Sequence, residues 1–272
     1  MVDMNIKKKF MSGCGSFPGT RDFSFNESLS IEKVTRTPIV DDSLYSKIVI
    51  PFFGDSFTYG SGIEYEYGLT NVIQQYLGDK YFSLNLGSPG FSLDGIIRII
   101  SQYYNRTDIT HSEVMVVSLP PLSRREHFCS ETVDYSNTEW RHAPMRDADI
   151  EYMRLLPEAE NFTAPAWKAY IETINPLTDI INLERNLVFI SNFAAARGIK
   201  VILWNDVHLH VNQDDRRDII EFIDDLGITL LTIDEIHRYR QSYVISKDDG
   251  HYNSLGMKVI ADVILNSVKQ YL

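Results

Sequence analysis

The feature that most constrains the fold is an alternation of short apolar runs with longer amphipathic segments. Each run has the length of a buried strand, and each segment that follows carries its apolar residues at helical spacing. Because crossover helices of this kind join parallel strands, the alternation predicts a three-layer α/β/α fold with a central parallel sheet of about five strands. The predicted strands are 46–53, 81–86, 113–119, 200–204 and 228–233, and the predicted helices are 67–77, 93–104, 179–197, 214–226 and 255–268.

A serine stands directly after the first predicted strand, in the stretch Gly54-Asp55-Ser56-Phe57. Open α/β sheets bind ligands at the carboxyl ends of their strands, so a serine here lies where reactive groups are presented. Glycine permits a tight turn, and the N-terminus of a following helix stabilises negative charge on an oxygen. Gly-Asp-Ser is also a common turn sequence with capping residues, so this stretch alone leaves both interpretations open.

A second polar stretch, Asp248-Asp249-Gly250-His251, precedes the last predicted helix. An aspartate three residues before a histidine on a loop can bond the imidazole and fix its tautomer. The histidine can then accept a proton from a serine that the fold brings close. Asp248 is the preferred partner of His251. Asp249 is the less favoured alternative, because its closeness to His251 in sequence makes the backward reach of its carboxylate to the imidazole ring harder.

Together the two stretches resemble the SGNH hydrolases, also called the GDSL family, which carry a Gly-Asp-Ser block near the N-terminus and an Asp-x-x-His block near the C-terminus. The matching positions are Ser56, Asp248 and His251, in the family's order. The resemblance implies the flavodoxin-like SGNH hydrolase fold. It also implies a Ser-His-Asp triad that cleaves an ester through an acyl-enzyme, with no metal and no cofactor.

The resemblance extends to the turn after the second predicted strand, where the family has Asn-x-x-x-x-Gly and this chain has Asn85 and Gly90. It implies that the backbone N–H groups of Ser56 and Gly90 form an oxyanion hole. Glycine suits this role because the substrate carbonyl can approach its backbone without meeting a Cβ. The structural alternative is a strand-to-helix turn that needs a positive φ.

The third block of the family, Gly-x-Asn-Asp, is not matched, because Leu122 stands where the oxyanion-binding Asn is expected. Leucine cannot donate a hydrogen bond, and losing one such donor costs roughly 3–4 kcal/mol of transition-state stabilisation. Ser123, Arg124 and Asn205 are the candidates to replace it. Arg124 or Arg125 could instead bind a substrate carboxylate through a bidentate fork.

The chain is predicted to form an irregular N-terminal arm over residues 1–44 and one domain over 45–272. Residues 124–176 break the alternation and are predicted to be an insertion that overhangs the site as a lid or specificity segment. Trp140 and Trp167 within it could stack on sugar rings or form a small satellite core. On a later segment, Asp206, His208 and His210 form a weak candidate metal site.

Charge and composition restrict the partners. A net charge of −11 argues against nucleic acid and against an anionic membrane surface. Two cysteines are too few for a disulfide framework. The chain shows neither the apolar core of a signal peptide nor a run long enough to span a membrane, so we expect a cytoplasmic or virion-associated protein.

Three functions remain open on the sequence alone. With water as the second acceptor, the triad makes an esterase for a small-molecule or carbohydrate ester, for example an O-acetyl sugar. With a sugar hydroxyl as acceptor, it makes an O-acyltransferase. The missing Asn favours a third possibility, a catalytically weak binding or structural module. The joint presence of Ser56, Asp248 and His251 favours catalysis. A phosphate-binding module fits less well, because the chain lacks the glycine-rich Lys-Ser/Thr pattern of such loops.

Overall fold

The computed structural model describes residues 46–89, 91–105, 107–122, 124–130, 138–143, 176–204, 213–247 and 249–272. The predicted arm at 1–44 and most of the predicted insertion at 124–176 lie outside these residues. The domain boundaries therefore stay predictions.

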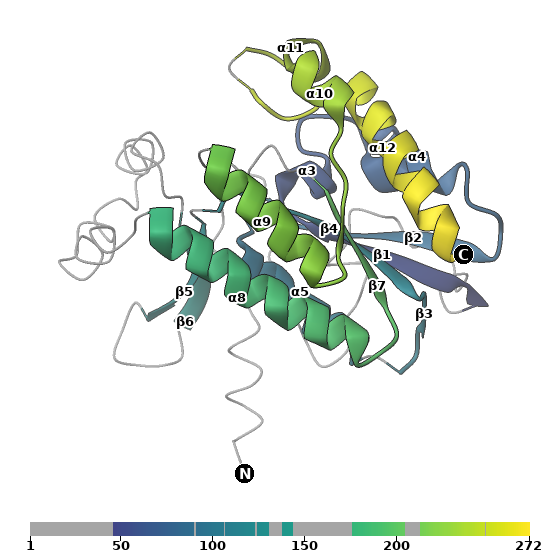
Figure 1. Ribbon diagram of the computed structural model, residues 1–272. Coiled ribbons are helices and arrows are strands. Elements are labelled where there is room, and N and C mark those ends of the chain that lie inside the picture. Colours follow the sequence, from purple (N-terminus) through teal and green to yellow (C-terminus); the bar gives the residue numbers. More distant parts are fainter. Residues whose placement is uncertain are drawn as a thin grey trace.

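The centre of the molecule is a parallel sheet with the strand order β2-β1-β4-β7-β8, and a short strand, β3, pairs with the start of β1 (Figure 1). Without β3, the five strands follow the 2-1-3-4-5 order of flavodoxin-like folds. This confirms the predicted α/β class and its parallel sheet. The strands are β1 (Ile48–Gly54), β2 (Tyr81–Gly87), β3 (Thr110–His111), β4 (Val114–Ser118), β7 (Lys200–Trp204) and β8 (Thr229–Leu230).

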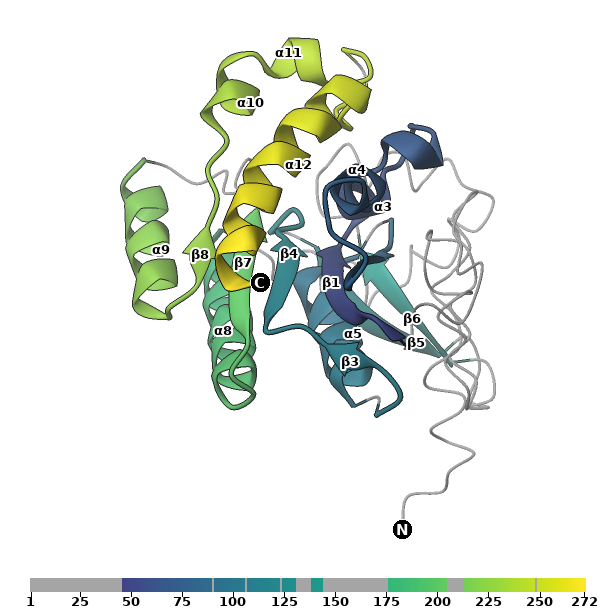
Figure 2. The same cartoon turned by 90° about the vertical axis from the view of Figure 1, so that its right-hand side faces the viewer.

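Helices cover both faces of the sheet (Figure 1, Figure 2). One buried cluster packs between the sheet and α5 (Leu93–Tyr104), α8 (Pro176–Ala195) and α9 (Gln213–Asp225). The other packs between the sheet and α4 (Leu69–Gln74) and α12 (Ser254–Val268). The fold thus has the three layers that the sequence predicts. Within the described part of the chain, no helix combines the length and apolar character needed to cross a membrane.

The strands read as continuous apolar runs because both of their faces are buried. In β1, Val49 and Phe53 belong to the cluster under α5, whereas Ile50 and Phe52 belong to the cluster under α12. β4 and β7 divide their side chains in the same alternating way. This two-sided burial follows from the period of two along a strand.

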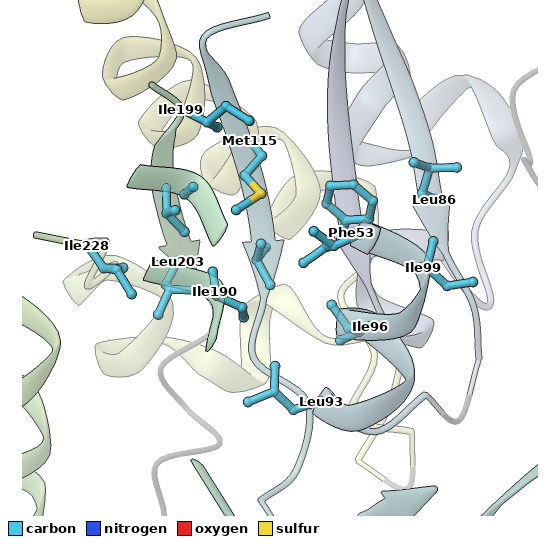
Figure 3. Packing of buried hydrophobic residues seen from close by; sticks show 14 of the residues in the cluster. Phe53, Leu86, Leu93, Ile96, Ile99, Met115, Ile190, Ile199, Leu203 and Ile228 are labelled. Atoms are coloured by element: carbon cyan, nitrogen blue, oxygen red, sulfur yellow. The ribbon is translucent and has the colours of Figure 1, made fainter. Parts of the chain in front are cut away.

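Figure 3 shows the first of these clusters from close by. Phe53 of β1, Met115 of β4 and Leu203 of β7 line one face of the sheet, next to Ile96 of α5 and Ile190 of α8. All five side chains are at most 1% exposed. Three neighbouring strands and two helices are therefore joined by a single apolar layer.

Two of the predicted helices begin at side-chain caps. The Ser92 hydroxyl accepts a hydrogen bond from the Gly95 N–H at 3.3 Å and starts α5. The Asn253 side-chain carbonyl accepts one from the Gly256 N–H at 3.0 Å and starts α12. Such caps satisfy N–H groups that have no partner within the helix. Both helices therefore begin within one residue of the predicted start.

Short elements are where the structure departs from the sequence prediction. The predicted strand 228–233 is shortened to the two residues of β8, and the predicted helix 67–77 is shortened to the six residues of α4. Among the described strands, β8 lies at the edge of the sheet and pairs with β7 alone. The elements that were not predicted are β3, α3 (Ser56–Tyr59), η2 (Tyr65–Tyr67), the hairpin β5 (Arg125–Ser130) and β6 (Thr138–Ala143), α10 (Asp234–Arg238), α11 (Arg240–Tyr243) and η6 (Lys269–Tyr271).

The division of α8 into a buried and an exposed face generates a stability prediction. Leu187 is 0% exposed and Leu177 is 64% exposed on the same helix. Leu187→Ala leaves a cavity, so we expect it to lower the free energy of unfolding by about 2–5 kcal/mol. Leu177→Ala should change it by no more than about 0.5 kcal/mol. Urea unfolding of both variants checks this, and equal losses would contradict the described packing.

Candidate active site

The predicted site residues follow strands that end at one edge of the sheet. Gly54 at the end of β1 pairs in register with Gly87 at the end of β2. Ser118 at the end of β4 pairs with Trp204 at the end of β7. Because these strands are parallel, the segments that follow them meet at the same edge, where open α/β sheets bind ligands.

The serine of the Gly-Asp-Ser stretch is the first residue of α3, a helix of four residues. Asp55 caps this helix, and its carboxylate accepts a hydrogen bond from the Phe57 N–H at 3.1 Å. The helix ends at Gly60, whose φ of 81° lies in the left-handed region that favours glycine. Ser56 is buried, and its own N–H is one of the helix-start donors that no residue of the helix accepts.

Two glycines let α3 lie directly on the strand ends. A Cβ on Gly54 would stand 2.1 Å from Thr58 Oγ1, and a Cβ on Gly87 would stand 2.6 Å from the backbone nitrogen of Tyr59. Asn85 adds a tie, since its side-chain amide donates to the Thr58 carbonyl at 2.8 Å while its oxygen accepts from the Gly87 N–H at 3.0 Å. These contacts set the position of Ser56 relative to the sheet.

The imidazole of His251 is bonded to a carboxylate on its own loop. His251 Nδ1 lies 2.6 Å from Asp249 Oδ1, and the same oxygen accepts the His251 backbone N–H at 3.0 Å. Partial burial acts to raise the pKa of Asp249. The hydrogen bonds and charge of His251 outweigh burial, so the pKa of this carboxyl lies below its ordinary value. Asp249 is therefore an anion that can hold an imidazole in one tautomer.

The His251 loop packs beside the serine. The rings of Phe57 and His251 have centroids 5.1 Å apart, and those of Phe57 and Tyr252 are 5.2 Å apart. Among the described residues, Ser56 Oγ and His251 make no hydrogen bond. Such bonds are often long before substrate binds and tighten in the reactive complex. The structure therefore brings the serine and the histidine loop together through the residue next to Ser56.

Arg124 lies beside the nucleophile turn. Its Nη1 is 2.8 Å from Asp55 Oδ2 and donates to the Phe91 carbonyl at 3.4 Å. Burial raises the pKa of the Asp55 carboxyl, and the Arg124 guanidinium, the Phe57 N–H and the charge of His251 oppose that rise. Leu122, at the position of the expected Asn, is partly buried against the apolar cluster under α5.

Several predicted residues lie outside the described residues: Gly90, Ser123, Asn205, Asp248, Trp167 and the weak metal-site trio Asp206, His208 and His210. Of Trp140, the structure describes only the backbone, in β6. In the part of the chain that is described, no three His, Cys, Asp or Glu side chains gather as a metal site would require. The roles of these residues stay predictions.

The sequence analysis did not find the pairing of Asp55 with Arg124 or the tie made by Asn85. A signal for the first was present, because a carboxylate that follows a buried strand needs a cation or several N–H donors to offset its desolvation. The sequence does not say which arginine supplies that charge. Asn85 could be recognised as part of a family block, but not as the residue that ties β2 to α3.

Comparison with known proteins identifies the fold. No protein-family model matches the chain, and no curated protein does either. Among solved structures, TesA matches with a TM-score of 0.50 and 14% identity, over 82% of this chain and 99% of TesA. The psychrotrophic esterase EstA from Pseudoalteromonas sp. matches with a TM-score of 0.50 and 13% identity, over 82% of this chain and 97% of EstA. At these identities the matches show a shared fold, and they confirm the fold that the resemblance to the SGNH hydrolases implies.

The close contact between α3 and β2 generates a prediction about stability. In Gly87→Ala the new Cβ meets the backbone of α3, so we expect the free energy of unfolding to fall by about 1–3 kcal/mol. Gly78→Ala is the matched control, because a Cβ there meets nothing within 4 Å. It should change stability by no more than about 0.5 kcal/mol. If urea unfolding shows the two variants to be equally stable, α3 does not lie on the strand as described.

Proposed function

We propose that the protein is a serine esterase that cleaves an acyl ester through a covalent acyl-enzyme. The observation that carries this proposal is the packing of a carboxylate-bound histidine, His251, against the residue that follows Ser56. Ser56 itself begins a helix at the ligand-binding edge of the sheet. A nucleophile, a base and a group that orients the base are the three parts that acyl transfer requires.

In the proposed mechanism, Ser56 Oγ attacks the ester carbonyl carbon, and His251 accepts the hydroxyl proton. Since Nδ1 is bonded to Asp249, the nitrogen that accepts this proton is Nε2. The tetrahedral intermediate then breaks its bond to the leaving alcohol, which takes the proton from His251. Water attacks the acyl-enzyme with the help of the same base and releases the acid and free Ser56.

The backbone N–H groups of Ser56 and Gly90 are the proposed oxyanion donors. The N–H of Ser56 is at the start of α3, where the helix dipole adds partial positive charge. Gly90 is assigned from the family's second block alone. Two backbone donors of this kind stabilise the negative oxygen of the tetrahedral intermediate in a site that excludes water.

We assign the orienting carboxylate to Asp249, although the family pattern favours Asp248. Asp249 bonds both the backbone N–H and the imidazole of His251, as aspartates commonly do with the residue two positions on. Closeness in sequence makes the backward reach of Asp249 to the ring harder. The bond from the His251 backbone N–H to Asp249 supports the assignment, because the same carboxylate oxygen also lies within bonding distance of Nδ1.

The substrate proposal is an ester of a small molecule or a carbohydrate, with an O-acetyl sugar as one example. EstA, one of the structural neighbours described above, is an esterase with a structure of its form inhibited by monoethylphosphonate. A phosphonate is therefore a suitable probe of this chain. An O-acyltransferase using the same triad is the second candidate. The absence of the third-block Asn at Leu122 favours the remaining candidate, a weakly active binding module.

Hydrolysis of p-nitrophenyl acetate tests the proposed nucleophile. Wild-type protein should release p-nitrophenol with saturable kinetics, and Ser56→Ala should abolish that activity because no acyl-enzyme can form. Ser61→Ala, which changes a half-buried serine in the turn after α3, is the matched control and should keep the wild-type rate. An active Ser56→Ala variant, or an inactive folded wild type, would contradict the proposal.

A pair of neighbouring variants tests which aspartate orients the histidine. Asp249→Asn removes the anion that faces the imidazole, so kcat should fall on the order of 100-fold or more. Asp248→Asn should leave kcat nearly unchanged. The measurement is steady-state hydrolysis of p-nitrophenyl acetate by both variants. If instead only Asp248→Asn loses activity, the family pattern identifies the orienting residue and the Asp249 contact is not the catalytic one.

A further inference from the structure

Arg124 connects two turns that are far apart in the sequence. Its Nη1 lies 2.8 Å from the Asp55 carboxylate and donates to the Phe91 carbonyl at 3.4 Å. Asp55 directly precedes Ser56, and Phe91 directly follows Gly90. One guanidinium nitrogen therefore bonds to both of the turns that carry the proposed oxyanion donors.

The position of Arg124 in the chain relates this contact to the missing Asn. Arg124 lies two residues after Leu122, on the segment that follows β4. Leu122 packs against an apolar cluster and offers no side-chain donor. The side chain of Arg124 reaches the carboxylate of Asp55, the residue directly before Ser56. An arginine suits such a position because its several N–H groups can bond more than one acceptor at once.

Burial restricts how the side chains of Asp55 and Arg124 can pair. The exposed fraction of the side chain is 0% for Asp55 and 23% for Arg124. A carboxylate removed from water in this way must keep its partners, so the bond between Asp55 and Arg124 is held in place by the cost of breaking it. Asp55 also caps α3 through the Phe57 N–H. The pair thus ties the segment after β4 to the start of the helix that carries Ser56.

We propose that Arg124 is a positioning residue for the esterase reaction. By bonding Asp55 and Phe91, it fixes the start of α3, which carries the Ser56 N–H, relative to the segment that begins at Phe91, next to the proposed donor Gly90. In this way it offsets part of what the absent Asn would supply. The inference rests on the proposed esterase function, and it assigns to Arg124 no contact with the substrate.

A purely structural role for Arg124 makes a different prediction. If the guanidinium only neutralises a buried charge, removing the charge and the cation together should restore both folding and activity. Asp55→Asn combined with Arg124→Met does this, since the Asn oxygen can still accept the Phe57 N–H and cap α3. If Arg124 also positions the two turns, this double variant should fold but stay slow.

The experiment measures the melting temperature, kcat and KM of four variants with p-nitrophenyl acetate: Arg124→Met, Arg124→Lys, the Asp55→Asn/Arg124→Met double variant, and Arg185→Met as a control. Arg185 pairs with Asp94 on the surface, with 67% of its side chain exposed. We expect Arg124→Met to lose both melting temperature and kcat. The double variant should regain the melting temperature, with a kcat roughly 100-fold below wild type, a loss comparable to that of one oxyanion donor.

Comparing the changes in kcat and KM distinguishes a positioning role of Arg124 from a role in substrate binding. KM of the double variant should stay near that of wild type, because Arg124 does not touch the substrate. Arg124→Lys keeps a cation beside Asp55, so it should fold and have an intermediate kcat. The Arg185→Met control should match wild type in every measurement.

The inference is overturned if the double variant or Arg124→Lys, whichever of them folds, turns over at the wild-type rate. A lack of turnover by wild-type protein is a separate result. It would contradict the esterase itself, and with it any role of Arg124 in that reaction.

Discussion

The close packing of α3 on the ends of β1 and β2 is the constraint on which the rest of the site depends. Gly54 and Gly87 have no Cβ that would collide with α3, and the Asn85 side-chain amide donates a hydrogen bond to the Thr58 carbonyl of that helix. This contact presents Ser56 at the sheet edge with its backbone N–H at a helix start. The loop of His251 packs on Phe57, the residue directly after Ser56.

Two aspartates near His251 have opposite environments and therefore different roles. Asp55 is fully buried, its pKa is raised by desolvation, and its carboxylate is bonded to the Phe57 N–H and to Arg124. Asp249 is partly exposed, its pKa lies below its ordinary value, and its carboxylate faces the imidazole. A carboxylate that is stably ionised and bonded to Nδ1 can support an imidazolium, whereas one already used to cap a helix and bind an arginine cannot. The environments thus favour a framework role for Asp55 and support the proposed orienting role of Asp249.

The sequence predicted the parts of the fold that burial dictates and missed those that depend on distant partners. The strand at 200–204 and the helix at 93–104 occur with the predicted bounds, because continuous apolar runs and a wide apolar stripe are set by local residues. The pairing of Asp55 with Arg124 spans 69 residues, and no local pattern encodes it. Whether Asp248 or Asp249 faces the imidazole of His251 depends on the conformation of one backbone turn, which residue spacing alone does not specify. The sequence therefore indicates Ser56 and His251 as candidates, whereas the contacts that support them are seen only in the three-dimensional structure.

The most direct test of the account is to treat the folded protein with a fluorophosphonate and locate the adduct by mass spectrometry of its peptides. We predict a single stoichiometric adduct on Ser56, because a serine activated by a neighbouring histidine base displaces fluoride from phosphorus. We also predict that Ser56→Ala stays unlabelled under the same conditions. A folded wild-type protein that takes up no label, or that carries the label on another serine, would contradict the proposed active site.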